Sequence, residues 1–156
     1  MKRDPRLVRL SWDHHHGLVL ALRISREAPA ADDAALGLLY GDVLAEWSRA
    51  VLPHFHAEEG CLLARLLRHP EGDAVVARTG RDHLEIEALV ADVRDATGLE
   101  TRRAAMLAFG ERLRAHIRWE EAELFEVSQA VMTDAELDAM AAEVQVLLAP
   151  VGREAG

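Results

Sequence analysis

A ten-residue pattern that occurs twice constrains this chain more than any other feature. Residues 54–63 and residues 116–125 both read His-apolar-x-x-Glu-Glu-x-x-Leu-apolar. On an α-helix, side chains four residues apart lie about 40° apart around the axis and share one face. His54 with Glu58, and His116 with Glu120, therefore each form an imidazole–carboxylate pair. Two such pairs on two helices predict two half-sites for metal.

Composition limits the other possibilities. At 156 residues the chain is long enough for one core, so we expect a single domain over residues 1–156. Its net charge of −9 argues against a nucleic-acid partner. No apolar run approaches the roughly 18–20 residues that cross a bilayer, and the N-terminus lacks the apolar stretch of a signal peptide. Cys61 is the single cysteine, so we expect a cytoplasmic protein without disulfides and without a membrane segment.

The spacing of apolar residues follows the helical period, and alternation of the strand type is absent. Capping residues and prolines divide the chain into five predicted helices, at about residues 11–27, 32–68, 73–97, 101–130 and 133–148. Pro53 falls inside the second helix and predicts a kink one residue before His54. Long helices with short connections favour an all-α fold: an up-down-up-down antiparallel four-helix bundle over about residues 11–130, with a short fifth C-terminal helix at about 133–148.

The two remaining long helices carry further histidines. His83 is followed by apolar residues at helical spacing, and His15 has a similar context because Leu18 and Leu22 follow it. His14 fits less well, since Gly17 would share its face. With one element per helix, the predicted inventory is four imidazoles and two carboxylates converging on the bundle axis. Imidazole and carboxylate donors suit iron and its neighbours, and two carboxylates can bridge two ions. The set therefore predicts a dinuclear metal centre with an open coordination position.

These elements together resemble the hemerythrin-like family, also called the HHE cation-binding domain. The resemblance spans about residues 7–127 and is carried by Asp13-His14-His15-His16-Gly17-Leu18, Pro53-His54-Phe55-x-x-Glu58-Glu59, Asp82-His83-x-x-Ile86 and His116-Ile117-x-x-Glu120-Glu121-x-x-Leu124-Phe125. It implies a four-helix bundle that holds two non-haem iron ions in an oxo- or hydroxo-bridged di-iron centre. Carried over position by position, it implies terminal ligands and bridges at His15, His54, His83, His116, Glu58 and Glu120.

Several alternatives stay open at the level of sequence. His14 is the alternative to His15. Glu59 and Glu121 replace the preceding glutamates only if a π-bulge turns them inward, because five residues correspond to about 140° on an ideal helix. Glu87, one turn after His83, is an additional candidate ligand. Thr79 stands where the oxygen-carrying members of the family have a further histidine, which argues against reversible oxygen carriage of their kind.

The resemblance implies a protein that binds or responds to a small molecule at the metal: oxygen, nitric oxide or peroxide, in sensing, scavenging or iron and redox handling. One alternative is a redox enzyme that consumes peroxide or nitric oxide at the same di-iron site. Another is a metal-free helical module that binds a protein partner of unidentified kind. Because the sequence contains no nucleophile–base pair, phosphate loop or nucleotide motif, we assign no catalytic residue and favour a metal-binding protein over a dedicated enzyme.

Overall fold

The computed structural model describes residues 2–149, and this part of the chain is helical with no strand. Its α-helices are α1 (Val8–Glu27), α2 (Asp33–Glu46), α3 (Leu52–Ala57), α4 (Ala64–Leu66), α5 (Asp73–Asp95), α6 (Leu99–Trp119), α7 (Phe125–Val131) and α8 (Asp134–Leu147). Short 3-10 turns are η1 (Pro5–Leu7), η2 (Ala28–Ala30) and η5 (Pro70–Gly72). Wider π-helical turns are η3 (Trp47–Val51), η4 (Glu58–Leu63) and η6 (Glu120–Leu124). The predicted domain also includes Met1 and residues 150–156, which lie outside the described residues.

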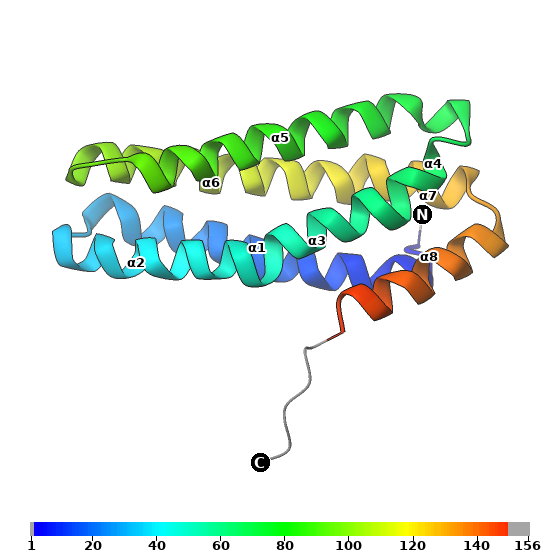
Figure 1. Cartoon of the computed structure of the whole chain (residues 1–156), viewed down its shortest axis with the longest axis horizontal. Helices are drawn as coiled ribbons and strands as arrows, with labels where there is room; N and C mark the ends of the chain where they lie inside the picture. Colours follow the sequence, from blue (N-terminus) through cyan, green and yellow to red (C-terminus); the bar gives the residue numbers. More distant parts are fainter. Residues whose placement is uncertain (1, 150–156) are drawn as a thin grey trace, which may run out of the picture.

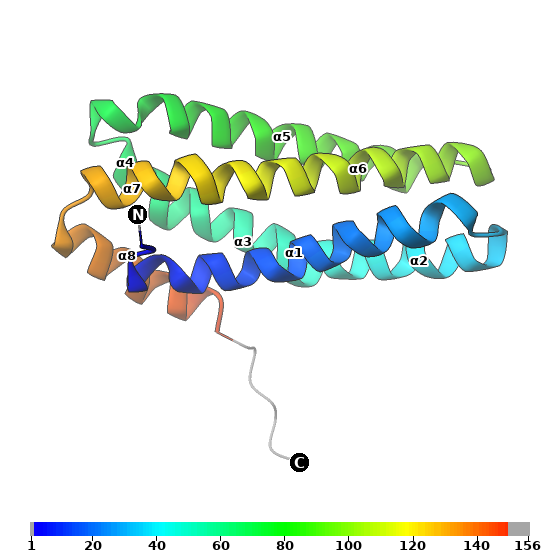
Figure 2. The same cartoon turned by 180° about the vertical axis from the view of Figure 1, so that it is seen from behind.

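The π turns join shorter helices into long rods. The α2–η3–α3–η4–α4 rod forms the second arm of the bundle, and α6–η6–α7 forms the fourth, with α1 and α5 as the other two. Figures 1 and 2 show these four rods side by side and α8 packed at one end. The predicted antiparallel four-helix bundle with a short fifth helix is therefore confirmed. Each helix begins and ends within about three residues of its predicted bounds.

The second rod changes direction near the predicted position. Figure 1 shows α3 rising away from the line of α2. Pro53 lies in the first turn of α3, and it has no N–H to donate to the preceding turn. The π turn η3 lies directly before it, where the wider helix absorbs the interrupted hydrogen-bond register.

Two apolar clusters fill the bundle and leave a polar layer between them. The larger cluster packs α1, α2, α5 and α6 around Trp47, Phe55 and Phe109. The smaller cluster packs η1, η4, η6 and α7 against the inner face of α8. Phe55 belongs to the first cluster and Phe125 to the second, and both rings contact histidines of the polar layer. The apolar clusters thus close both ends of the region where the predicted ligands lie.

Helix α8 is fixed at its start by a capping box. The Thr133 hydroxyl accepts the backbone N–H of Glu136, and the Glu136 carboxylate accepts the backbone N–H of Thr133. The buried residues Leu137, Met140 and Val144 then pack on the smaller cluster. Among residues 2–149, no helix combines the length and apolar character that crossing a membrane requires.

Candidate metal centre

Four histidines, one from each rod, meet in the polar layer. They are His14 of α1, His54 of α3, His83 of α5 and His116 of α6, and all four are buried. Gly17, one turn after His14, leaves space for Ile117 of α6, because a Cβ at this position would lie 2.6 Å from Cδ1 at the tip of that side chain. The first and fourth rods thus pack together at the level of the histidines.

Glu58 and Glu120 complete the layer, and neither is exposed. Each is the first residue of a π turn and keeps the predicted one-turn relation to its histidine. Nε2 of His54 lies 3.0 Å from Oε1 of Glu58, and Nε2 of His116 lies 2.8 Å from Oε1 of Glu120. The two copies of the sequence pattern therefore face each other across the bundle axis.

Each glutamate also reaches the histidines of the opposite half. Oε2 of Glu58 lies 3.3 Å from Nε2 of His83, and Oε2 of Glu120 lies 3.0 Å from Nε2 of His14. The six side chains form two groups with donor atoms within 4.8 Å of one another: His14 and His54 with both glutamates, and His83 and His116 with both glutamates. Both groups contain both carboxylates, so Glu58 and Glu120 are shared between them.

On the first helix, the structure places His14 in the polar layer and not the predicted His15. His15 is exposed, whereas its neighbour His14 is buried in the layer. One residue along an α-helix turns a side chain by about 100°, so only one of the two can face inward. Leu22, which supported His15, is 46% exposed, while Gly17 lies on the buried face. The pair Asp13-His14 matches Asp82-His83, and this match is the signal in the sequence that selects His14.

The second glutamate of each pair takes a different position. Oε1 of Glu121 lies 2.7 Å from Nδ1 of His14, and Oε1 of Glu59 lies 2.8 Å from Nδ1 of His83. Glu59 and Glu121 therefore contact the outer nitrogens of the imidazoles, and the inner oxygens belong to the preceding glutamates. The π turns begin at Glu58 and Glu120, after the one-turn spacing is complete, so they do not turn the second glutamates inward.

Aspartates face the outer nitrogens of the other two histidines. Nδ1 of His116 lies 3.3 Å from Oδ2 of Asp82, and Nδ1 of His54 lies 3.5 Å from Oδ2 of Asp13. Each imidazole thus has a carboxylate on its outer side and the shared glutamates on its inner side. Outer carboxylates of this kind fix the tautomer and the ring orientation of histidines that bind metal.

Other candidates named from the sequence lie outside the cluster. Thr79 is buried, but its hydroxyl donates to the Val75 carbonyl at 2.8 Å. Glu87 is half-buried and belongs to no group of potential ligands among residues 2–149. The structure therefore brings together His14, His54, His83, His116, Glu58 and Glu120.

Electrostatic interactions in the layer favour the charged forms of both the imidazoles and the carboxylates. Burial disfavours the imidazolium of His83, yet the contacts with Glu120 and Glu58 outweigh it and raise the pKa to about 10. Burial and the charge of Glu58 oppose ionisation of Glu120, but His116 and His14 lower its pKa to about 2. Two ionised carboxylates in a buried site require positive charge nearby, either as protons on the imidazoles or as metal cations.

The hydrogen-bond geometry distinguishes protonated imidazoles from metal cations as the source of the positive charge. The inner Nε2 atoms of all four histidines and both oxygens of each glutamate are buried without a hydrogen-bond partner. The short distances between them do not have hydrogen-bond directions, while the outer nitrogens of His14, His83 and His116 do have partners. Buried donors and acceptors left unpaired are costly, and a cation between them would satisfy every one. The donor set therefore fits metal ions.

The comparisons with known proteins agree with this geometry. The family model described as the hemerythrin HHE cation-binding domain matches residues 6–128, which is most of the chain. The chain belongs to the hemerythrin HHE family. A search of curated proteins and a search of solved structures gave no significant match. Family membership and the two groups of histidine and glutamate together indicate a metal-binding helical protein.

Proposed function

We propose that this hemerythrin HHE protein binds two non-haem iron ions in the polar layer and that the pair binds or responds to oxygen, nitric oxide or peroxide. The observation that supports the proposal most strongly is the sharing of Glu58 and Glu120 by both groups of donors. A site with imidazole and carboxylate donors suits iron. Iron would supply one-electron redox chemistry and an exchangeable coordination position.

The residues have distinct roles in this proposal. His14 and His54 would hold one ion, and His83 and His116 would hold the other. Glu58 and Glu120 would span the two ions, since each glutamate contacts histidines of both halves. These residues would supply two imidazole nitrogens and carboxylate oxygens to each ion, and a small molecule would take a further position. The outer carboxylates would accept the Nδ1–H groups of the imidazoles and keep the rings in orientation.

Aromatic rings cover two of the four imidazoles. Phe55 stacks on His83 with ring centroids 3.8 Å apart, and Phe125 stacks on His14 with centroids 5.2 Å apart. Both phenylalanines are fully buried. An apolar enclosure limits access to small molecules and strengthens the electrostatic contacts inside it. This supports a ligand of a few atoms over a larger organic substrate.

Iron content tests the proposal directly. The protein reconstituted with ferrous iron under anaerobic conditions is expected to hold about two irons per chain. Glu58→Ala should lose iron because it removes a donor common to both ions, whereas His56→Ala, at an exposed position of the same rod, should keep it. A chain that retains less than about one metal ion after reconstitution contradicts the proposal. Addition of oxygen, nitric oxide and peroxide to the reduced protein then separates binding from turnover, and thus a sensor or scavenger from a redox enzyme.

A further inference from the structure

The internal repeat lets the surroundings of the two metal positions be compared residue by residue. Asp13-His14 on α1 corresponds to Asp82-His83 on α5, 69 residues later, and His54 corresponds to His116, 62 residues later. The same offsets pair His16 with Glu85, and Ala50 with Arg112. These residues occupy equivalent corners of the bundle, one beside each pair of histidines.

The corner beside His83 and His116 is closed by an arginine. Arg112 lies 2.5 Å from Oδ1 of Asp82 and 2.9 Å from Oε2 of Glu85. Arg78 adds a contact of 3.6 Å with Asp82. The Asp82 side chain is 2% exposed, and its other oxygen accepts from Nδ1 of His116. A guanidinium that joins two carboxylates in this way holds the outer side of His116 firmly.

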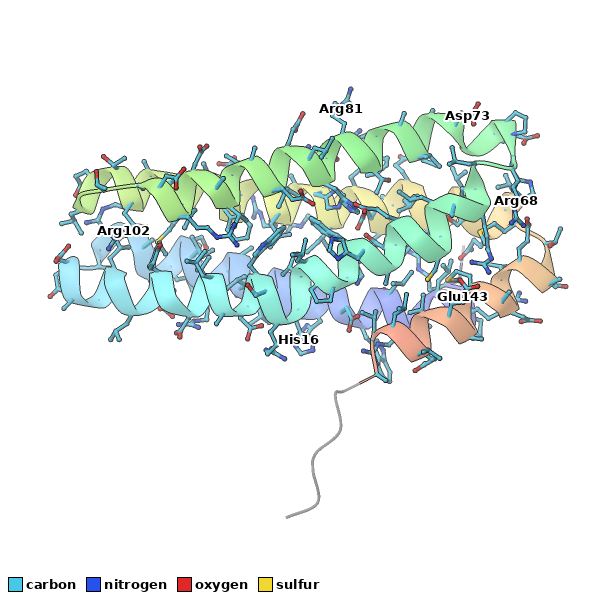
Figure 3. The ribbon with its side chains drawn as sticks, viewed as in Figure 1. His16, Arg68, Asp73, Arg81, Arg102 and Glu143 are labelled. Atoms are coloured by element: carbon cyan, nitrogen blue, oxygen red, sulfur yellow. The ribbon has the colours of Figure 1, made fainter. Side chains whose placement is uncertain are left out.

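The equivalent corner beside His14 and His54 lacks this closure. Ala50 has no group that could bridge Asp13 and His16, and His16 points away from the bundle, as Figure 3 shows. The Asp13 carboxylate is 21% exposed and lies 3.5 Å from Nδ1 of His54. Its cationic neighbour is Arg9, at 3.6 Å.

The corner beside His14 and His54 also contains a small cavity. A cavity of about 10 Å³ contacts both His14 and His54 and reaches Asp13, His16 and Ala50. On the outer side of these three residues lies a surface groove of about 690 Å³. The groove is also lined by Arg9, Arg49, Pro53 and the end of α8. A cavity of this size holds about one water molecule. Asp13, His16 and Ala50 line both the cavity and the groove, so they lie between the two.

We propose that the corner formed by Asp13, His16 and Ala50 is the port through which the ion at His14 and His54 exchanges with solvent, and that Arg112 closes the equivalent port at His83 and His116. The inference rests on the proposed function, since it requires both ions. A water molecule in the cavity can replace the first bond lost by the leaving ion. The Asp13 carboxylate and the His16 imidazole can then accept the ion at the mouth, because both are donors for divalent cations.

Charges at the mouth are compatible with this role. Arg49 is paired with Glu46 at 2.8 Å, and Arg9 donates to the Leu148 carbonyl at 2.7 Å as well as contacting Asp13. Both arginines are therefore engaged with acceptors, and Asp13 remains the carboxylate that faces the outer nitrogen of His54. At the closed corner the corresponding carboxylate, Asp82, is occupied by Arg112 and is not accessible to an ion.

Release of iron to a colorimetric ferrous chelator tests the port. Anaerobic protein loaded with two ferrous ions is expected to release them in two phases of similar amplitude. Arg112→Ala should accelerate the slow phase by at least about tenfold and leave the fast phase unchanged, by analogy with the loss of other groups that orient metal ligands. The double variant His16→Glu with Ala50→Arg copies the closed corner and should slow the fast phase. Arg114→Ala on the same helix, exposed and without an ion pair among residues 2–149, should change neither phase.

The outcomes separate the port from the proposed function. If the chain binds two ions but releases them at one rate, or if Arg112→Ala accelerates both phases equally, the port is wrong while the di-iron proposal stands. If the chain binds fewer than about one ion, the proposed function fails and the port fails with it. Thermal unfolding of each metal-free variant shows whether it folds. If Arg112→Ala does not fold, the double variant His16→Glu with Ala50→Arg still tests the port. An unchanged rate of the fast phase in the double variant rejects the port.

Discussion

The ring of Phe55 lies face to face with the imidazole of His83, with 5° between the ring planes and 3.8 Å between the centroids. Trp47 contacts the same phenylalanine edge-on at 5.7 Å and also contacts Phe109. The aromatic core thus continues directly into the polar layer. Packing that stabilises the bundle also fixes the orientation of an imidazole in the candidate metal centre.

Truncation of Phe55 should therefore lower the free energy of unfolding of the metal-free protein. We expect Phe55→Ala to lower the free energy of unfolding by about 3–5 kcal/mol, because it removes a buried ring and leaves a cavity. Chemical denaturation of the metal-free protein measures this loss. Leu38→Ala removes an apolar side chain that is 75% exposed, and we expect it to change stability by less than about 0.5 kcal/mol. An equal effect of both substitutions would contradict the packing described here.

Two adjacent histidines provide a matched test of register on α1. His14→Ala should lose at least one iron per chain, since it removes a donor from one group of ligands. His15→Ala should retain the iron content of the unmodified chain, because this side chain is exposed. Iron is measured after identical anaerobic reconstitution of each variant. Retention of two irons by His14→Ala together with loss by His15→Ala would restore the register predicted from the sequence.

Glu121 should affect metal affinity without binding metal itself. Its carboxylate accepts from the Ser11 hydroxyl at 2.6 Å, contacts Arg3 at 3.0 Å and faces Nδ1 of His14. We expect Glu121→Gln to weaken metal binding by about 10–100-fold, because the amide orients the imidazole less well than the carboxylate. Competition with a chelator gives the affinity, and Glu123→Gln in the same π turn is the control. Complete loss of one iron in Glu121→Gln at saturating metal would instead indicate that Glu121 is a ligand.

The cap of α8 should make stability depend on pH in the acid range. The backbone N–H of Thr133 and the side chain of His69 lower the pKa of Glu136. A carboxyl whose pKa is lower in the folded state stabilises the protein at pH values above its ordinary pKa of 4.5, and this contribution is lost as the pH falls through the lowered folded-state pKa. We expect Glu136→Gln to reduce the loss of stability of the metal-free protein between pH 5 and pH 3, measured by thermal unfolding.

Thr133 gives an independent measure of the same cap. Its hydroxyl accepts the backbone N–H of Glu136. Thr133→Ala should cost about 0.5–2 kcal/mol at neutral pH, the usual range for loss of an N-cap side chain. Thr101→Ala is a suitable control because Thr101 is exposed in the first turn of α6 and does not cap it. If the two threonine variants are equally stable, the capping box does not stabilise α8.

Much of the site was predictable because its parts are local. His54 with Glu58, and His116 with Glu120, are one helical turn apart in the sequence, so each pair is brought together by any regular helix. Helix ends were predictable for a similar reason, since caps and prolines act on neighbouring residues. The choice between His14 and His15 depended on which face of α1 meets α6, and that is a property of packing between distant segments.

The roles of Glu59 and Glu121 also depended on tertiary structure. Both lie beside a glutamate that faces inward, and both contact a histidine on a different rod. The sequence predicted that a π turn would be needed to bring them to the metal. The structure has π turns at these positions, but the turns follow the one-turn spacing and leave the second glutamates on the outer nitrogens.

The sequence by itself determined that the chain forms long helices and that two of them carry the same imidazole–carboxylate pair, because both properties arise within a few consecutive residues. Tertiary structure decided how those pairs combine. It selected His14 through the packing of α1 against α6 at Gly17, and it placed a carboxylate on the outer side of every imidazole. It also closed one corner of the site with Arg112 and left the other beside Ala50, because the side chains that meet there come from helices far apart in the chain.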